Sequence, residues 1–198
     1  MKIEPYILIG GASKRFGRDK ATFPFEGERL ADRAAHIAET ALKSGPACFV
    51  TSKKAPNFYS KEGRTVITDR VPGRGVIGAV HAALEYARSR WIFVLACDLP
   101  FVAAEFVSFL GHRIDDKKDA LIPVQTDGRW QPLCAFYRVG PCLQVFEPAV
   151  RYAGKGPSLR EITARLEASL VGPEEIRAKF DELVLKNVNL PEDLFESE

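Results

Sequence analysis

Long apolar runs and a large net charge are both missing from this sequence of 198 residues. No apolar stretch reaches the roughly 18 residues that would suggest a membrane-spanning helix, and no signal-peptide pattern opens the chain. The formal net charge of +2 argues against a protein that coats nucleic acid with a broadly basic surface. We therefore expect a cytoplasmic protein that has neither a membrane nor a nucleic-acid partner.

Cysteine is also scarce. The four cysteines form no C-x-x-C pair, and their wide spacing argues against a structural zinc site or a disulfide framework. Cys48, Cys97 and Cys134 sit within apolar runs, where buried reduced thiols are the simplest expectation. No repeat, low-complexity tract or linker interrupts the chain, and its length suits one well-buried core. We therefore predict a single domain over residues 1–198.

Short apolar runs alternate with segments of helical periodicity. The strand-like runs cover residues 6–9, 48–50, 65–67, 91–97, 120–124, 133–137 and 183–185, and helical patterns cover 30–42, 77–87 and 102–110, with two or three more between 141 and 183. This alternation predicts an α/β fold with a mostly parallel sheet covered on both faces. Residues 91–97 form the most hydrophobic run and should be a central strand. Because such sheets bind ligands beyond the carboxyl ends of their strands, the loops after residues 9, 67 and 97 should carry the site.

The strongest functional signal lies in residues 8–20, which read LIGGASKRFGRDK. Gly10 and Gly11 have no Cβ, so successive backbone N–H groups can approach an anion. The cations of the segment are Lys14, Arg15, Arg18 and Lys20. Neither a Walker A loop nor G-x-G-x-x-G can be read through it. A solvated basic turn is the alternative, but so many cations directly after a buried strand favour a polyphosphate site.

A carboxylate follows the predicted central strand. Asp98 stands between the apolar run and Leu99-Pro100. Mg²⁺ prefers one or two carboxylates, water and phosphate oxygens, so a carboxylate at a strand mouth is well placed to hold it. The alternative is an N-cap for the helix expected over 102–110, although Asp98 lies early for that role.

These motifs resemble a known family. Residues 8–20 are similar to the signature L-A-G-G-x-S-x-R-M-G-x-D-K of the MobA-type molybdenum cofactor guanylyltransferases, with Ile9 for alanine and Phe16 for methionine. Residues 97–100 resemble the family's P-C-D-x-P segment, with Ala96 in place of the first proline. The Asp-Lys ending favours this family over the cytidylyltransferases and the sugar-phosphate nucleotidyltransferases, whose loops are similar.

Three further segments extend the resemblance along the chain. Residues 73–78 resemble the family's G-P-L-x-G, residues 131–137 resemble Q-P-x-x-A-L-Y, and residues 187–194 resemble N-I-N-T-P-E-D-L. The last two segments place Gln131 near the pterin acceptor and Asn189 near the metal.

The resemblance implies a three-layer Rossmann-like nucleotidyltransferase fold and a magnesium-dependent guanylyltransferase. Such an enzyme would transfer GMP from GTP to molybdopterin or molybdenum-molybdopterin, with proteins of cofactor biosynthesis and molybdoenzymes as partners. The implied catalytic residues are Arg15, Lys20 and Asp98. The implied nucleotide contacts are Leu8, Ile9, Gly10, Gly11, Lys20, Thr51, Asp69, Gly75 and Asp98, Thr51 standing where the family has asparagine. The implied Mg²⁺ ligands are Asp98 and Asn189.

Several alternatives remain open from the residues alone. Asp69 could begin a turn, Arg74 could be solvated, and Asn189 could cap the final helix. The three histidines, His36, His81 and His112, lie in helical patterns without metal-site spacing and are expected to be structural or exposed. The rival functions are a nucleotidyltransferase that uses CTP or a sugar-phosphate acceptor, and a non-catalytic nucleotide-binding cofactor carrier.

Overall fold

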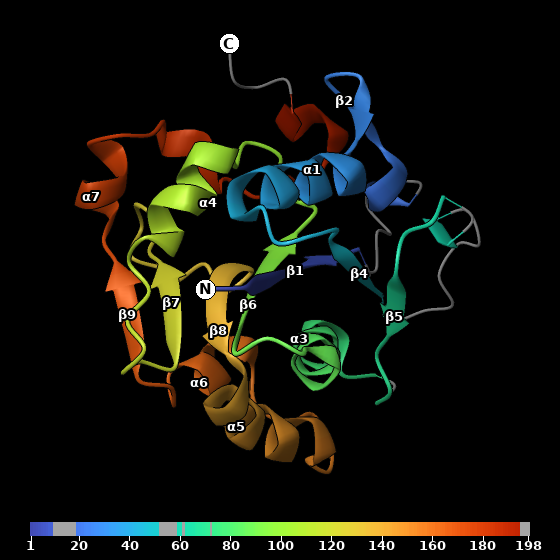
Figure 1. The fold of residues 1–198 in the computed structure, drawn as a ribbon, viewed down its shortest axis with the longest axis vertical. Coiled ribbons are helices and arrows are strands. Elements are labelled where there is room, and N and C mark those ends of the chain that lie inside the picture. The colour runs from blue at the N-terminus through green and yellow to red at the C-terminus, as the bar shows by residue number, and fades with distance from the viewer. Residues whose placement is uncertain (10–18, 52–58, 61, 72, 195–198) are drawn as a thin grey trace.

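The computed structural model describes residues 1–9, 19–51, 59–60, 62–71 and 73–194. Its centre is a seven-stranded sheet in the order β5-β4-β1-β6-β8-β7-β9, with helices on both faces (Figure 1). The strands of this sheet are β1 Ile3–Leu8, β4 Cys48–Thr51, β5 Val66–Thr68, β6 Trp91–Ala96, β7 Ala120–Pro123, β8 Cys134–Arg138 and β9 Ala168–Val171. The helices are α1 Leu30–Leu42, α3 Gly75–Tyr86, α4 Ala104–Gly111, α5 Val139–Arg151, α6 Leu159–Thr163 and α7 Pro173–Arg177. Short elements complete the list: a hairpin of β2 Pro24–Phe25 and β3 Glu28–Arg29, and the 3-10 helices η1 Lys20–Thr22, η2 Glu182–Leu185 and η3 Pro191–Leu194.

One strand runs against the others. β1, β4, β5 and β6 pair in parallel, as do β7 and β9, whereas β8 pairs antiparallel with both β6 and β7. β8 is thus the reversed strand of the described sheet, and the predicted α/β fold with a mostly parallel sheet is confirmed.

The sheet separates two apolar cores. On β6, Trp91 and its alternate residues pack toward α1 and α4, while Ile92 and its alternate residues pack toward α3 and α5. All six residues of this strand are buried, as the sequence predicts for a central strand. Figure 1 shows α1 and α4 on one side of the sheet and α3, α5 and α6 on the other.

The structure differs from the sequence predictions in two places. Residues 183–185 are not a strand but part of η2, whose N-cap Asp181 accepts a hydrogen bond from the Leu183 N–H at 2.8 Å. A three-residue apolar run is too short for periodicity to distinguish strand from helix. The edge strand β9 was not anticipated, because only one of its four residues is buried and its alternation is weak.

Two further observations concern the cysteines and the length of the helices. All four cysteines are free and buried, as expected for three of them. Within the described ranges, no helix is long and apolar enough to cross a membrane.

Candidate active site

The carboxyl ends of β1, β4 and β6 meet at one edge of the sheet. Leu8, the last residue of β1, pairs with Val50 on one side and with Ala96 on the other. Just beyond, the Ile9 N–H donates to the Val50 carbonyl at 2.9 Å, and the Cys97 N–H donates to the Leu8 carbonyl at 3.2 Å. Ile9 and Cys97 therefore lie side by side at this edge of the sheet.

Lys20 and Asp98 come together at this edge. Lys20 begins η1, whose N-cap Asp19 accepts a hydrogen bond from the Ala21 N–H at 3.1 Å. The Lys20 Nζ lies 3.7 Å from the Asp98 Oδ2 and also donates to the main-chain carbonyl of Val188. The Lys20 side chain is only 14% exposed and that of Asp98 26%. The two charges therefore face each other where water screens them only in part.

Asp98 keeps one carboxylate oxygen for a further partner. Its main-chain carbonyl accepts a hydrogen bond from the Val188 N–H at 2.9 Å, which fastens the strand end to the C-terminal segment. Its Oδ1 is buried and has no hydrogen-bond partner within the described part of the chain. A buried acceptor left without a donor is costly, so this oxygen suits a bound cation or a hydrogen-bond donor from a ligand.

The thiol next to Asp98 is no competitor for that role. Burial, and secondarily the charge of Asp98, raise the pKa of Cys97 to about 12. The thiol therefore stays protonated near neutral pH, where it is neither a good nucleophile nor a good metal ligand.

Asp69 lies at the end of β5, against the helix that follows. It is buried, its N–H donates to the Thr51 carbonyl at 2.9 Å, and its Oδ1 accepts from the Val71 N–H at 2.8 Å. Its Oδ2 is buried and unpartnered among the described residues. A Cβ placed on Gly78 of α3 would lie only 2.0 Å from this Oδ2. Gly78 therefore lets the carboxylate pack against the backbone of α3.

This contact predicts the effect of adding one methyl group. Gly78→Ala should lower the free energy of unfolding by about 1–3 kcal/mol, because the buried Asp69 carboxylate must move and lose its bond to Val71. Urea denaturation measures the change. Gly140→Ala in α5 is the matched control, since a Cβ there meets nothing within 4 Å and the helix gains propensity. Equal stability of the two variants would contradict the packing argument.

A cavity of about 700 Å³ lies beside the C-terminal segment. It opens between residues 124–133, which join β7 to β8, and residues 182–189. Asn187 and Asn189 both line it, and the Asn187 Oδ1 accepts a hydrogen bond from the Gln131 Nε2 at 2.8 Å. Val188, which contacts Lys20 and Asp98, is thus flanked by two asparagines of the cavity wall.

Comparison with known proteins identifies the family of this chain. Residues 6–169 match the model of the MobA-like NTP transferase domain. The chain belongs to this family. The molybdenum cofactor guanylyltransferase of Desulfosudis oleivorans is 30% identical over 195 residues, which cover 97% of this chain and 92% of that protein. A probable molybdenum cofactor guanylyltransferase of Geobacillus sp. is 28% identical over 194 residues, with 96% and 95% covered.

A solved structure agrees with the family. Molybdopterin-guanine dinucleotide biosynthesis protein A from Archaeoglobus fulgidus superposes with a TM-score of 0.78 at 26% identity, covering 99% of this chain and 97% of that one. The resemblance identified from the sequence is confirmed, and the chain is a nucleotidyltransferase of the MobA-like family.

The structure brings together most of the residues that the MobA-like motifs single out. Beside Lys20 and Asp98, the described ones at the carboxyl edge are Leu8, Ile9, Thr51, Asp69 and Gly75. Gly75 begins α3 with a φ of 54°, a conformation that favours glycine. The Leu8 carbonyl and the Ile9 N–H already take part in the sheet. Gly10, Gly11 and Arg15 lie outside the described residues, and the roles of all these residues stay predictions.

Three alternatives weighed from the sequence turn out differently. Arg74 is partly exposed but is also held by the chain itself, because it donates to the main-chain carbonyls of Gly154 at 2.9 Å and of Tyr152. Asp98 does not cap α4, whose N-cap is Ala103. At the final helix, η3, the Asp193 carboxylate rather than the Asn189 side chain accepts the hydrogen bonds at the start of the helix.

The Asp193 carboxylate organises the C-terminal segment. Its Oδ2 accepts hydrogen bonds from the N–H groups of Asn189 at 2.7 Å and Leu190 at 2.8 Å. These N–H groups hold the pKa of the Asp193 carboxyl below its usual value. The Asn189 backbone is therefore fixed while its side chain lines the cavity.

Sequence reasoning missed two contributors to the site. Val188 acts through its main chain, and a valine carries no sequence signal for such a role. Gly78 was noted only as part of the 73–78 motif, and its contact with Asp69 depends on how β5 and α3 are placed.

Proposed function

We propose that this protein transfers GMP from GTP to molybdopterin or molybdenum-molybdopterin, forming the guanine dinucleotide cofactor and pyrophosphate. The observation that supports this best is the pairing of Lys20 with Asp98 at the edge where β1, β4 and β6 end, together with the Asp98 Oδ1, which has no partner among the described residues. The relatives that match nearly the full length of the chain are named molybdenum cofactor guanylyltransferases. A place in molybdenum cofactor biosynthesis follows, with cofactor-biosynthesis proteins and molybdoenzymes as partners.

The reaction requires neutralisation of the negative charge on the phosphates more than it requires a general base. An oxygen of the acceptor's terminal phosphate attacks the α-phosphorus of GTP, a P–O bond forms there, and the bond to the bridging oxygen breaks. Pyrophosphate leaves with that electron pair. A phosphate monoester has a second pKa near 6 and is already largely dianionic at pH 7. Lys20 would hold the triphosphate and offset the charge on the departing pyrophosphate, and Arg15 would add a second cation.

Mg²⁺ fits the donor atoms present. Asp98 would hold it through its carboxylate, since the Oδ1 is buried without a partner among the described residues and carboxylate oxygen is a preferred ligand. Asn189, beside Val188, would add an amide oxygen. When bound, the ion would neutralise phosphate oxygens.

The cavity beside Val188 suits the acceptor. Its volume of about 700 Å³ lies within the range of small-ligand sites, roughly 300–1,000 Å³. Trp130 adds an aromatic surface to the wall, and Gln131 and Asn187 add paired amide groups. A flat, polar-edged ring such as a pterin matches that chemistry.

Nucleotide choice tests the proposal. With molybdopterin as acceptor, we expect pyrophosphate release with GTP to exceed that with CTP, ATP or UTP by roughly 100-fold or more. A wrong base would leave polar groups of the binding site buried without hydrogen-bond partners. Initial rates with each nucleotide, with and without the pterin, measure this. A preference for CTP, or tight GTP binding without transfer to the pterin, would favour one of the rival functions.

A further inference from the structure

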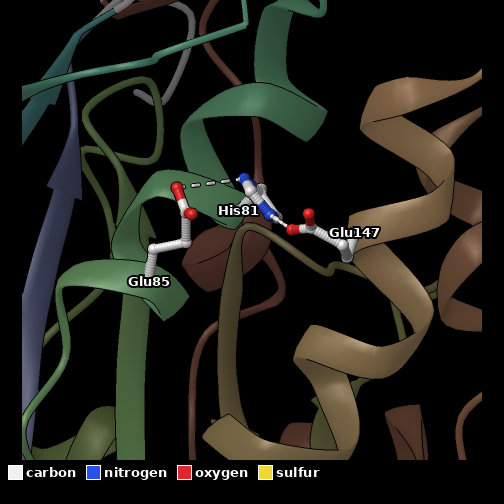
Figure 2. Close-up of side chains that lie close together, drawn as sticks. All are labelled: His81, Glu85 and Glu147. Carbon is white, nitrogen blue, oxygen red and sulfur yellow. Dashed lines mark hydrogen bonds and ion pairs between the residues drawn. The ribbon is translucent and has the colours of Figure 1, made fainter.

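Three potential metal ligands converge between α3 and α5, outside the site described above (Figure 2). His81 and Glu85 lie one helical turn apart on α3, and Glu147 reaches them from α5. The His81 Nε2 lies 2.5 Å from the Glu147 Oε2, and its Nδ1 lies 3.5 Å from the Glu85 Oε2. One ligand atom from each residue lies within 4.8 Å of the other two.

The cluster combines a buried imidazole with a rim open to solvent. The His81 side chain is 5% exposed, whereas Glu85 is 35% and Glu147 36% exposed. The hydrogen bond with His81 lowers the pKa of the Glu147 carboxyl, so this group is anionic at neutral pH. Arg151 lies 2.5 Å from the Glu147 Oε1, which leaves the Oε2 facing the imidazole.

The two helices are held together independently of the cluster. Val80, Ala83 and Phe146 are fully buried in the core between them. Arg74, at the start of α3, donates to main-chain carbonyls just beyond the end of α5. The backbones that carry the three side chains are therefore fixed before any ion arrives, which lowers the cost of ordering ligands.

We propose that His81, Glu85 and Glu147 bind a divalent transition-metal ion of the Zn²⁺ type, with water completing its coordination. One imidazole nitrogen and two carboxylate oxygens suit Zn²⁺, whereas Mg²⁺ and Ca²⁺ prefer oxygen alone. Bonds of about 2.1 Å in tetrahedral geometry separate ligand atoms by about 3.4 Å. Glu85 and Glu147 face different nitrogens of the His81 ring, so an ion on Nε2 would require the partly exposed Glu85 carboxylate to move from the Nδ1 side toward Nε2 and the His81–Glu147 contact to open.

A bound ion would fasten α3 to α5. His81 lies six residues after Gly75, or about 9 Å along the helix axis. The first turn of α3 carries Gly75 and Gly78, and Gly78 packs against Asp69. The ion would therefore stiffen the helix that borders the nucleotide side. This inference uses none of the phosphate-site residues and does not depend on the transfer reaction.

Direct metal binding tests the proposal. Tag-free protein carrying Asp98→Asn, stripped with a chelator, would be titrated with Zn²⁺ by calorimetry, because this background removes the carboxylate proposed for Mg²⁺. We expect one saturable site. His81→Gln and Glu85→Gln should each weaken it by at least about tenfold. Bound Co²⁺ should show the visible absorption of a nitrogen- and oxygen-coordinated ion and lose it in both variants.

The matched control is His36→Gln. His36 faces a single carboxylate, that of Glu28, at 3.6 Å on an exposed surface, so its loss should leave Zn²⁺ binding unchanged. If His81→Gln fails to fold, Glu85→Gln still tests the proposal, because the Glu85 side chain is partly exposed and its substitution should not disturb the core. Absence of a saturable site, or affinity unchanged in Glu85→Gln, would overturn the proposal and show the cluster to be an ion pair between helices.

Discussion

Asp98→Asn is expected to lower the rate of nucleotidyl transfer by about 10³-fold or more. The amide keeps the shape of the side chain but removes the negative charge proposed to hold Mg²⁺. The free energy of unfolding should change by less than about 1 kcal/mol, because the substitution removes a 3.7 Å ion pair that is partly open to water. Single-turnover transfer and urea denaturation, measured on the same preparation, give both quantities.

The matched control is Asp116→Asn. Asp116 also faces a cation, Arg90 at 3.4 Å, and accepts a hydrogen bond from the Trp91 Nε1 at 2.8 Å, which an amide oxygen can still accept. It lies at the amino end of β6, whereas Asp98 follows the carboxyl end. Asp116→Asn should keep full activity. Near-normal turnover in Asp98→Asn would remove the metal role from the proposal.

Lys20→Met is expected to lower kcat/KM for GTP by about 10²–10³-fold. Methionine keeps much of the buried side-chain volume but cannot neutralise the triphosphate. Because Lys20 is proposed to act on the leaving pyrophosphate as well as on bound GTP, kcat should fall and KM should rise. Steady-state rates over a range of GTP concentrations separate the two effects.

Lys118→Met is the control for that variant. Lys118 faces Glu167 at 3.9 Å, a distance close to that of Lys20 and Asp98, but on an exposed surface. Its loss should leave both kinetic constants unchanged. If Lys20→Met raised only the KM for GTP and left kcat intact, Lys20 would contribute to binding alone and the proposed transition-state role would be wrong.

Much of the fold was predictable because strong local patterns decide it. The length and β-rich composition of the apolar run over 91–97 favour a strand buried on both faces, and residues 30–42 show a continuous helical stripe that the structure reproduces as α1. β9 and η2 could not be predicted in the same way. Their apolar residues are too few for a period to show, and pairing with β7 or a cap from Asp181 decides their conformation.

The meeting of Lys20 and Asp98 was predictable because parallel strands place their carboxyl ends at one edge. Contacts made through the main chain were not, since the carbonyl of Val188 is independent of its side chain. Glu147 is 66 residues from His81, and only the packing of α5 on α3 brings its carboxylate to the imidazole. Sequence spacing therefore suggested structural histidines and gave no indication of a three-residue cluster.

The reversal of β8 decides at which end of the sheet residues 124–133 lie. Because Cys134 at the start of β8 pairs with Leu95 near the end of β6, residues 124–133 emerge at the same edge as Asp98. A parallel strand in that position would carry Gln131 to the far end, about 13–17 Å away for a five-residue strand. A change in the length of residues 124–133 would therefore reshape the wall of the proposed acceptor cavity without moving β1, β4 or β6.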